Sequence, residues 1–301
     1  MWIFLKMIDH IEEKINQILL LCKRPVNSIL AGEYHSTFKG RGIDFSELRE
    51  YQYGDDVRLV DWNVTARMRK TFVRLYKEER DLTLYFIVDF SASTLFSSTN
   101  KSKREIISEI CSLIALAANK NNDNVGLIIF TDEVEHYITP AKGKKHIMRI
   151  IDDLLTYQPK SKGTNISNAL QFFSSVSKKS SIVFLLSDFI GDNFVSDLAI
   201  SSHKHDLIAV SIYDNVERKF PQLNIINMVD LETNKKLSAD MNHKQVESFN
   251  KLNKERHDRN LEYFRSHNVD LLEISTKDDH IQKIIDFFKA NMRSILSETG
   301  G

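Results

Sequence analysis

Residues 83–93 limit the possible folds of this chain more than any other stretch. No polar side chain lies between Tyr85 and Val88, and such a dense apolar run is typical of a strand covered on both faces, as in a parallel sheet. The run ends in the pattern D-x-S-x-S, which is formed by Asp89, Ser91 and Ser93. Because ligands of open α/β sheets bind just outside the carboxyl ends of the strands, this point is a candidate functional site.

Further apolar strands alternate with amphipathic helices along the rest of the chain. The pattern predicts strands at 125–130, 182–186, 207–212 and 269–274, and a hairpin partner at a sheet edge at 134–139. It predicts helices at 101–119, 146–157, 165–177 and 244–267, and a terminal helix around 281–288. This alternation is typical of βαβ units, so we expect an α/β fold with a doubly wound, mostly parallel sheet.

The residues before the central strand differ in composition from the rest of the chain. A helix is expected at 8–22, charged and aromatic residues are interleaved with glycines from 32 to 80, and 71–76 alternates like a strand. We therefore expect an N-terminal helix and subdomain at 1–80 that packs on the main domain, a main domain at 81–292, and a frayed C-terminus at 293–301.

Two interpretations of the subdomain stay open. It is either a small, partly exposed unit held by Arg/Asp pairs or a surface for a partner, because Trp, Tyr and Arg are the usual anchors of interfaces. The second interpretation assigns partner binding to Arg41, Arg49, Tyr51, Asp55, Arg58, Trp62 and Arg67.

The charge balance argues against nucleic acid as a partner. Lys and Arg total 41, as do Asp and Glu, so the formal net charge is zero and no overall field attracts a polyanion. A nucleic-acid binder working through Arg67, Arg69, Lys70 and Arg74 is therefore disfavoured.

The two cysteines and the lengths of the apolar runs bear on location. Cys22 and Cys111 form no C-x-x-C pair, which argues against a disulfide framework and indicates a reducing cytoplasm. No apolar stretch reaches the roughly 18 residues of a membrane span, so we expect no direct membrane insertion.

Two other points in the sequence offer small oxygen donors. Thr164 precedes a predicted helix, and Asp188 follows the predicted strand at 182–186. With Asp89, Ser91 and Ser93 they can meet at one edge of the sheet, although serines after a strand are often only a helix cap. Hydroxyl and carboxylate oxygens without His or Cys suit Mg²⁺ or Mn²⁺, so the five residues predict a site for one of these ions.

These motifs carry a family resemblance that covers nearly the whole chain. D-x-S-x-S, a G-T-N before a helix and an S-D after an apolar strand resemble the metal-ion-dependent adhesion site of von Willebrand factor A domains. More narrowly, residues 32–93 are similar to the bacterial family called domain of unknown function 58. That similarity is carried by Gly40-Arg41-Gly42, Arg49-Glu50-Tyr51, Gly54-Asp55-Asp56-Val57-Arg58, Asp61-Trp62 and Ala66-Arg67.

The resemblance implies roles for the site residues. Ser91, Ser93 and Thr164 become direct ligands, with Asp89 and Asp188 near the ion directly or through water, and an acidic side chain of a protein partner fills the remaining position. Thr94 departs from the pattern, since many such sites have Met there, and we expect this to change packing rather than metal affinity. Family members are often encoded near MoxR-type AAA+ ATPases and are thought to act as adaptors or assembly factors.

We therefore expect a non-enzymatic, metal-dependent interaction module that works with a MoxR-type AAA+ ATPase. A metal-dependent phosphoester hydrolase is the alternative, but Ser91 stands where D-x-D chemistry needs a second acid. His203 and His205 are expected to be solvated in a connecting segment. The basic residues at 142–145 lack the spacing of a phosphate-binding loop.

Overall fold

The computed structural model describes residues 44–52, 55, 60–68, 70–77, 82–191, 194–221, 225–229, 236–240 and 243–298. The chain divides into two compact units, Lys39–Leu82 and a larger unit that contains everything described from Thr83 onward. The helix expected at 8–22 lies outside the described residues.

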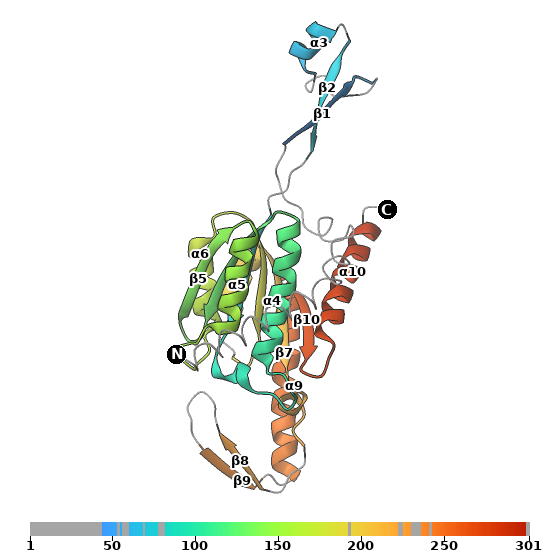
Figure 1. Ribbon diagram of the computed structural model, residues 1–301. Coiled ribbons are helices and arrows are strands. Elements are labelled where there is room, and N and C mark those ends of the chain that lie inside the picture. Colours follow the sequence, from blue (N-terminus) through green and yellow to red (C-terminus); the bar gives the residue numbers. More distant parts are fainter. Residues whose placement is uncertain are drawn as a thin grey trace, which may run out of the picture. The chain divides into compact units, whose positions relative to one another are not determined.

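The larger unit is built on a six-stranded sheet (Figure 1). Its strand order is β10-β7-β6-β3-β4-β5, with β5 antiparallel to β4 and all other neighbours parallel. The bounds are β3 Thr83–Asp89, β4 Asn124–Phe130, β5 Val134–Ala141, β6 Ile182–Ser187, β7 Asp206–Tyr213 and β10 Asp270–Ser275. The predicted α/β class, the mostly parallel sheet and the edge hairpin are confirmed.

Helices cover both faces of this sheet. They are α4 Lys103–Lys120, α5 Lys144–Thr156, α6 Ile166–Val176, α7 Val195–Lys204, α9 His243–Ser266 and α10 His280–Glu298, with the short η2 Ala92–Leu95 and α8 Asn215–Arg218 at strand ends. On one face, Tyr85 and Ile87 of β3 share an apolar core with residues of α6, α7 and α9. On the other, the ring of Phe86 lies 5.9 Å from that of Phe184, which is 6.3 Å from Phe288 of α10. Alternate residues of β3 therefore serve two cores, as a doubly wound fold requires.

The smaller unit, Lys39–Leu82, has its own two-stranded antiparallel sheet. β1 (Asp44–Glu50) pairs with β2 (Phe72–Lys77), and α3 (Trp62–Met68) lies between them in sequence. The strand expected at 71–76 is confirmed. Within this unit Arg49 donates a hydrogen bond to Asp55 at 2.6 Å. This contact agrees with the interpretation that Arg/Asp pairs hold the subdomain together.

Several elements of the larger unit differ from the expectation. α7 and the hairpin of β8 (Ile225–Val229) and β9 (Lys236–Asp240) were not predicted. α7 buries only Leu198 and Ser201, which is too narrow an apolar stripe to stand out in the sequence. α10 continues to Glu298, so helix persists into the segment 293–301 that was expected to fray.

The expectation that both histidines are solvated is wrong for His205. His203 is exposed, but His205 is only 5% exposed and its ring lies 4.6 Å from that of Phe173. Burial, with a smaller contribution from Lys204, lowers the pKa of His205 to about 4. His205 is the extended residue between α7 and β7, and its buried side chain is neutral at pH 7.

None of the helices in the described residues is both long and apolar enough to cross a membrane.

Candidate metal centre

Asp89 stands at the carboxyl end of β3 and both of its oxygens are held by protein donors. The Ser91 amide donates to Oδ1 at 2.8 Å and the Ser187 hydroxyl donates to Oδ2 at 2.6 Å. Asp89 is fully buried, and burial together with the charge of Asp188 raises its pKa to about 6. With both oxygens engaged, Asp89 suits contact with an ion through water better than direct coordination.

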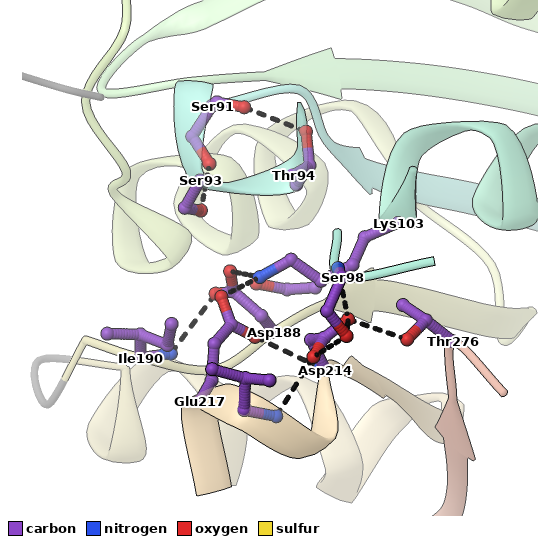
Figure 2. Close-up of polar contacts among 12 residues, drawn as sticks. Ser91, Ser93, Thr94, Ser98, Lys103, Asp188, Ile190, Asp214, Glu217 and Thr276 are labelled. Carbon is purple, nitrogen blue, oxygen red and sulfur yellow. Dashed lines mark hydrogen bonds and ion pairs between the residues drawn. The ribbon is translucent and has the colours of Figure 1, made fainter. Parts of the chain in front are cut away.

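The hydroxyls of Ser91 and Ser93 are arranged as a pair (Figure 2). Their Oγ atoms lie 3.0 Å apart. Octahedral Mg²⁺ holds oxygen ligands at about 2.1 Å, which places adjacent ligands about 3.0 Å from each other. The pair therefore has the separation of two neighbouring ligands of such an ion.

Arg104 of α4 fixes the loop that carries these serines. Its guanidinium donates to the carbonyl oxygens of Phe90 and Ser91, the latter at 2.9 Å, and to the Thr94 hydroxyl at 3.2 Å. Burial lowers the pKa of Arg104 to about 10, partly offset by the charge of Asp89, so the side chain stays charged at pH 7. Thr94 is buried and donates to the Ser91 carbonyl at 2.7 Å, so its side chain braces the loop.

Thr164 lies in the segment between α5 and α6, and this segment is tied to the same edge of the sheet. The Ala92 amide donates to the Lys162 carbonyl at 2.9 Å, and the Asn165 amide donates to the Thr131 carbonyl at 2.8 Å. The carboxylate of Glu135 accepts from the amide of Ser161 at 2.8 Å. These bonds fix the backbone on both sides of Thr164, whose side chain is half-buried.

Asp188 follows β6 and is part of a buried ion cluster. Its Oδ2 accepts from the Lys103 ammonium at 2.8 Å, and Oε1 of Glu217 accepts from the same ammonium at 2.7 Å. The Lys103 side chain is 0% exposed and that of Asp188 is 2% exposed. Burial alone would lower the pKa of Lys103, but the two carboxylates outweigh it and raise the pKa.

The structure thus places four of the five predicted residues in the hydrogen-bonded edge formed by the ends of β3 and β6, and anchors the segment of the fifth, Thr164, to it. In the part of the chain that the structure describes, no group of three or more His, Cys, Asp or Glu side chains is arranged to hold a metal.

Three charged residues of this edge were missed, namely Lys103, Arg104 and Glu217. Lys103 and Arg104 stand in a predicted amphipathic helix, where basic side chains are normally solvated. One signal was available, because Asp214 and Glu217 have the spacing of a capping box, and that box is present at the start of α8.

The predicted partner-binding residues fall in the smaller unit. Trp62 is 66% exposed and Arg67 is exposed, while Tyr51 is half-buried and Arg49 is paired with Asp55. Arg41 and Arg58 lie outside the described residues.

Residues 47–259 match the model of a family described as protein of unknown function DUF58. The chain belongs to the DUF58 family. Uncharacterised proteins of Mycobacterium tuberculosis and Mycobacterium bovis are each 24% identical to it over 217 residues, which cover 71% of this chain and 68% of the relative. Both relatives are uncharacterised, so they add no activity to the family assignment.

Solved structures resemble this DUF58 chain at low identity. The conserved hypothetical protein BatB of Bacteroides thetaiotaomicron is 13% identical, covers 70% of this chain and 99% of its own, and gives a TM-score of 0.45. An aerotolerance-related membrane protein of Bacteroides fragilis is also 13% identical. The match covers 71% of this chain and 99% of that protein, with a TM-score of 0.47.

Proposed function

We propose that this DUF58 protein is a non-enzymatic interaction module that binds a protein partner through a divalent cation. Ser91, Ser93 and Thr164 would hold Mg²⁺ or Mn²⁺, with Asp89 and Asp188 acting through water, as in the adhesion site of von Willebrand factor A domains. The bound ion would supply an open coordination position for a carboxylate of the partner. The observation that carries the proposal is the Ser91–Ser93 hydroxyl pair, with its Oγ atoms 3.0 Å apart beside two engaged carboxylates.

The same contacts weigh against the hydrolase alternative. A phosphoester hydrolase of the D-x-D kind needs one carboxylate as nucleophile and a second as acid and base. Here both oxygens of Asp89 accept hydrogen bonds from Ser91 and Ser187, and the position of the second acid is occupied by Ser91 itself. This arrangement supports a role in holding an ion over a role in hydrolysis.

The charges at the site and the family resemblance support one class of partner. Lys103 and Arg104 sit close to the site, so a divalent ion added there creates an excess of positive charge that an acidic side chain can neutralise. We propose that the partner that supplies this acidic side chain is a MoxR-type AAA+ ATPase, and that the two proteins bind each other in the cytoplasm.

Mn²⁺ titration of the purified chain tests the metal centre. We expect the wild type to bind one ion, and the S91A/S93A variant to lose binding by at least about tenfold. The matched control is S97A, because the Ser97 and Thr99 hydroxyls form a similar i, i+2 pair at 2.8 Å outside the proposed ligand set. Equal affinity of S91A/S93A and wild type would refute the assigned ligands.

Partner capture is the second test. An immobilised MoxR-type ATPase from the same organism should retain the wild type in Mg²⁺ and release it in EDTA, while S97A behaves as the wild type. Retention that is indifferent to EDTA would show that the metal does not mediate the contact.

A further inference from the structure

Lys103 is a buried cation between two acids at the candidate metal centre. Its side chain is 0% exposed, and its ammonium bonds to Asp188 at 2.8 Å and to Glu217 at 2.7 Å (Figure 2). A buried lysine is costly unless acids pair with it. Here one of the two pairing acids, Asp188, is also a proposed ligand residue, so the Lys103 charge bears on metal binding.

The ammonium is held in place from two independent elements. Asp188 follows β6, and its Oδ1 accepts from the Ile190 amide at 3.3 Å. Glu217 belongs to the capping box of α8, where its Oε2 accepts from the Asp214 amide at 3.0 Å. Asp214 is itself fixed by Ser98 and by Thr276, whose hydroxyl donates to it at 2.7 Å. Glu217 thus gives Lys103 a second anchor that does not depend on Asp188.

The charges at this edge leave the site weakly negative. Among the charged side chains that bond to the serine loop, to Asp188 or to Lys103, together with Asp89, three contribute negative charges (Asp89, Asp188 and Glu217) and two contribute positive ones (Lys103 and Arg104). Asp214 is outside this count, because its carboxylate is bonded to Ser98, Thr276 and the Val216 amide. The net charge is one negative unit without metal, and a divalent ion turns it into one positive unit. A single carboxylate from outside would bring the filled site to neutrality.

We propose that Lys103 is a positioning residue that restrains metal binding by the free protein. It occupies Asp188 and offsets one of the carboxylate charges, so the ion is held loosely until an external carboxylate joins it. This inference rests on the proposed metal-dependent function. It adds that Lys103 and Glu217 set the affinity of the site in opposite directions without touching the ion.

Mn²⁺ affinity of two charge variants, measured by calorimetry with the metal alone, tests this role. K103M removes the positive charge and frees Asp188, so we expect at least about tenfold tighter binding. E217Q keeps a carbonyl oxygen for Lys103 but removes a negative charge, so we expect about fivefold to tenfold weaker binding. The control is K101M, because Lys101 pairs with Glu109 at 2.7 Å, outside this cluster, and should leave the affinity unchanged.

The two variants make the outcome decisive. If K103M does not fold, E217Q carries the test alone, because its isosteric change keeps the packing of a side chain that is 22% exposed. Weaker binding by E217Q supports the inference. Equal binding by wild type and E217Q overturns the role of the cluster and leaves the metal-dependent function standing, whereas a wild type that binds no Mn²⁺ overturns both.

Discussion

At the scale of single residues, the burial of His205 makes the free energy of unfolding depend on pH. Its imidazole is buried against Phe173, its Nδ1 has no hydrogen-bond partner, and burial lowers its pKa from 6.5 to about 4. The neutral form is favoured in the folded chain, so its stabilising effect is complete above pH 6.5. That effect is lost as the pH falls from 6.5 through about 4, because the unfolded chain then binds the proton first.

We therefore predict that H205F, which keeps an aromatic ring, is less sensitive to acid than the wild type. Between pH 7 and pH 4 the wild type should lose up to about 3 kcal/mol of unfolding free energy more than H205F. Urea denaturation at a series of pH values measures this difference. The control is H203F, because His203 is exposed, and parallel curves for all three proteins would contradict the assignment.

Residue burial was the least predictable property of the sequence. Asp89, Ser91 and Ser93 were predicted because they are neighbours at the end of one apolar strand. The burial of Lys103 depends instead on acids 85 and 114 residues away along the chain. His205 is buried by Phe173 of a different helix. Such long-range partners leave no local pattern, so sequence periodicity cannot report them.

At the scale of elements, the packing of β4 against its neighbours depends on a glycine. A Cβ atom at Gly126 would lie 3.0 Å from two ring carbons of Tyr85 on β3 and 3.0 Å from Cγ of Pro140 on β5. The Tyr85 ring is also packed edge-on against Phe173 at 5.0 Å. Neighbours on both sides of β4 therefore leave no room for a side chain.

We predict that G126A destabilises the chain by about 1 to 3 kcal/mol through this overpacking. Chemical denaturation should show a lower midpoint with an unchanged slope. G191A is the matched control, because a Cβ at Gly191 would meet no atom within 4 Å. A midpoint for G126A that equals that of G191A would show that the strands shift to make room.

Elements were predictable wherever one face is continuously apolar. β3, β4, β6 and β7 have almost no exposed residue, so their apolar runs are unbroken in the sequence. The end of β6 lies beside Asp89 for the same reason, because parallel strands end at one edge, and Ser187, next to Asp188, donates to Asp89 there. α7 and the hairpin of β8 and β9 were missed because short or weakly apolar segments look like connections.

At the scale of the whole molecule, the candidate metal centre and the predicted partner surface belong to different units. The core cluster that includes Tyr85, Phe173 and Phe264 is drawn from residues after Thr83, as are all the residues of the metal centre. Trp62, Arg49 and Arg67 belong to Lys39–Leu82, which has its own sheet. The proposed metal binding and the proposed partner surface should therefore be separable by replacing the smaller unit alone.

We predict that replacing Lys39–Leu82 with a flexible Gly-Ser linker of equal length leaves cooperative unfolding and Mn²⁺ affinity within about twofold of the wild type. Capture of the ATPase partner should fall by at least about tenfold, because the exposed Trp62 and its neighbours are then missing. Calorimetry with Mn²⁺ and capture in Mg²⁺ measure the two properties on the same protein.

The full-length W62A variant makes this test specific, since it removes the 66% exposed ring and leaves the unit in place. Weakened capture by both proteins with unchanged Mn²⁺ affinity would assign partner binding to this surface together with the ion. If the linker protein captures the partner as well as the wild type does, the partner contacts the larger unit alone, and the Arg/Asp-paired subdomain is then a structural element.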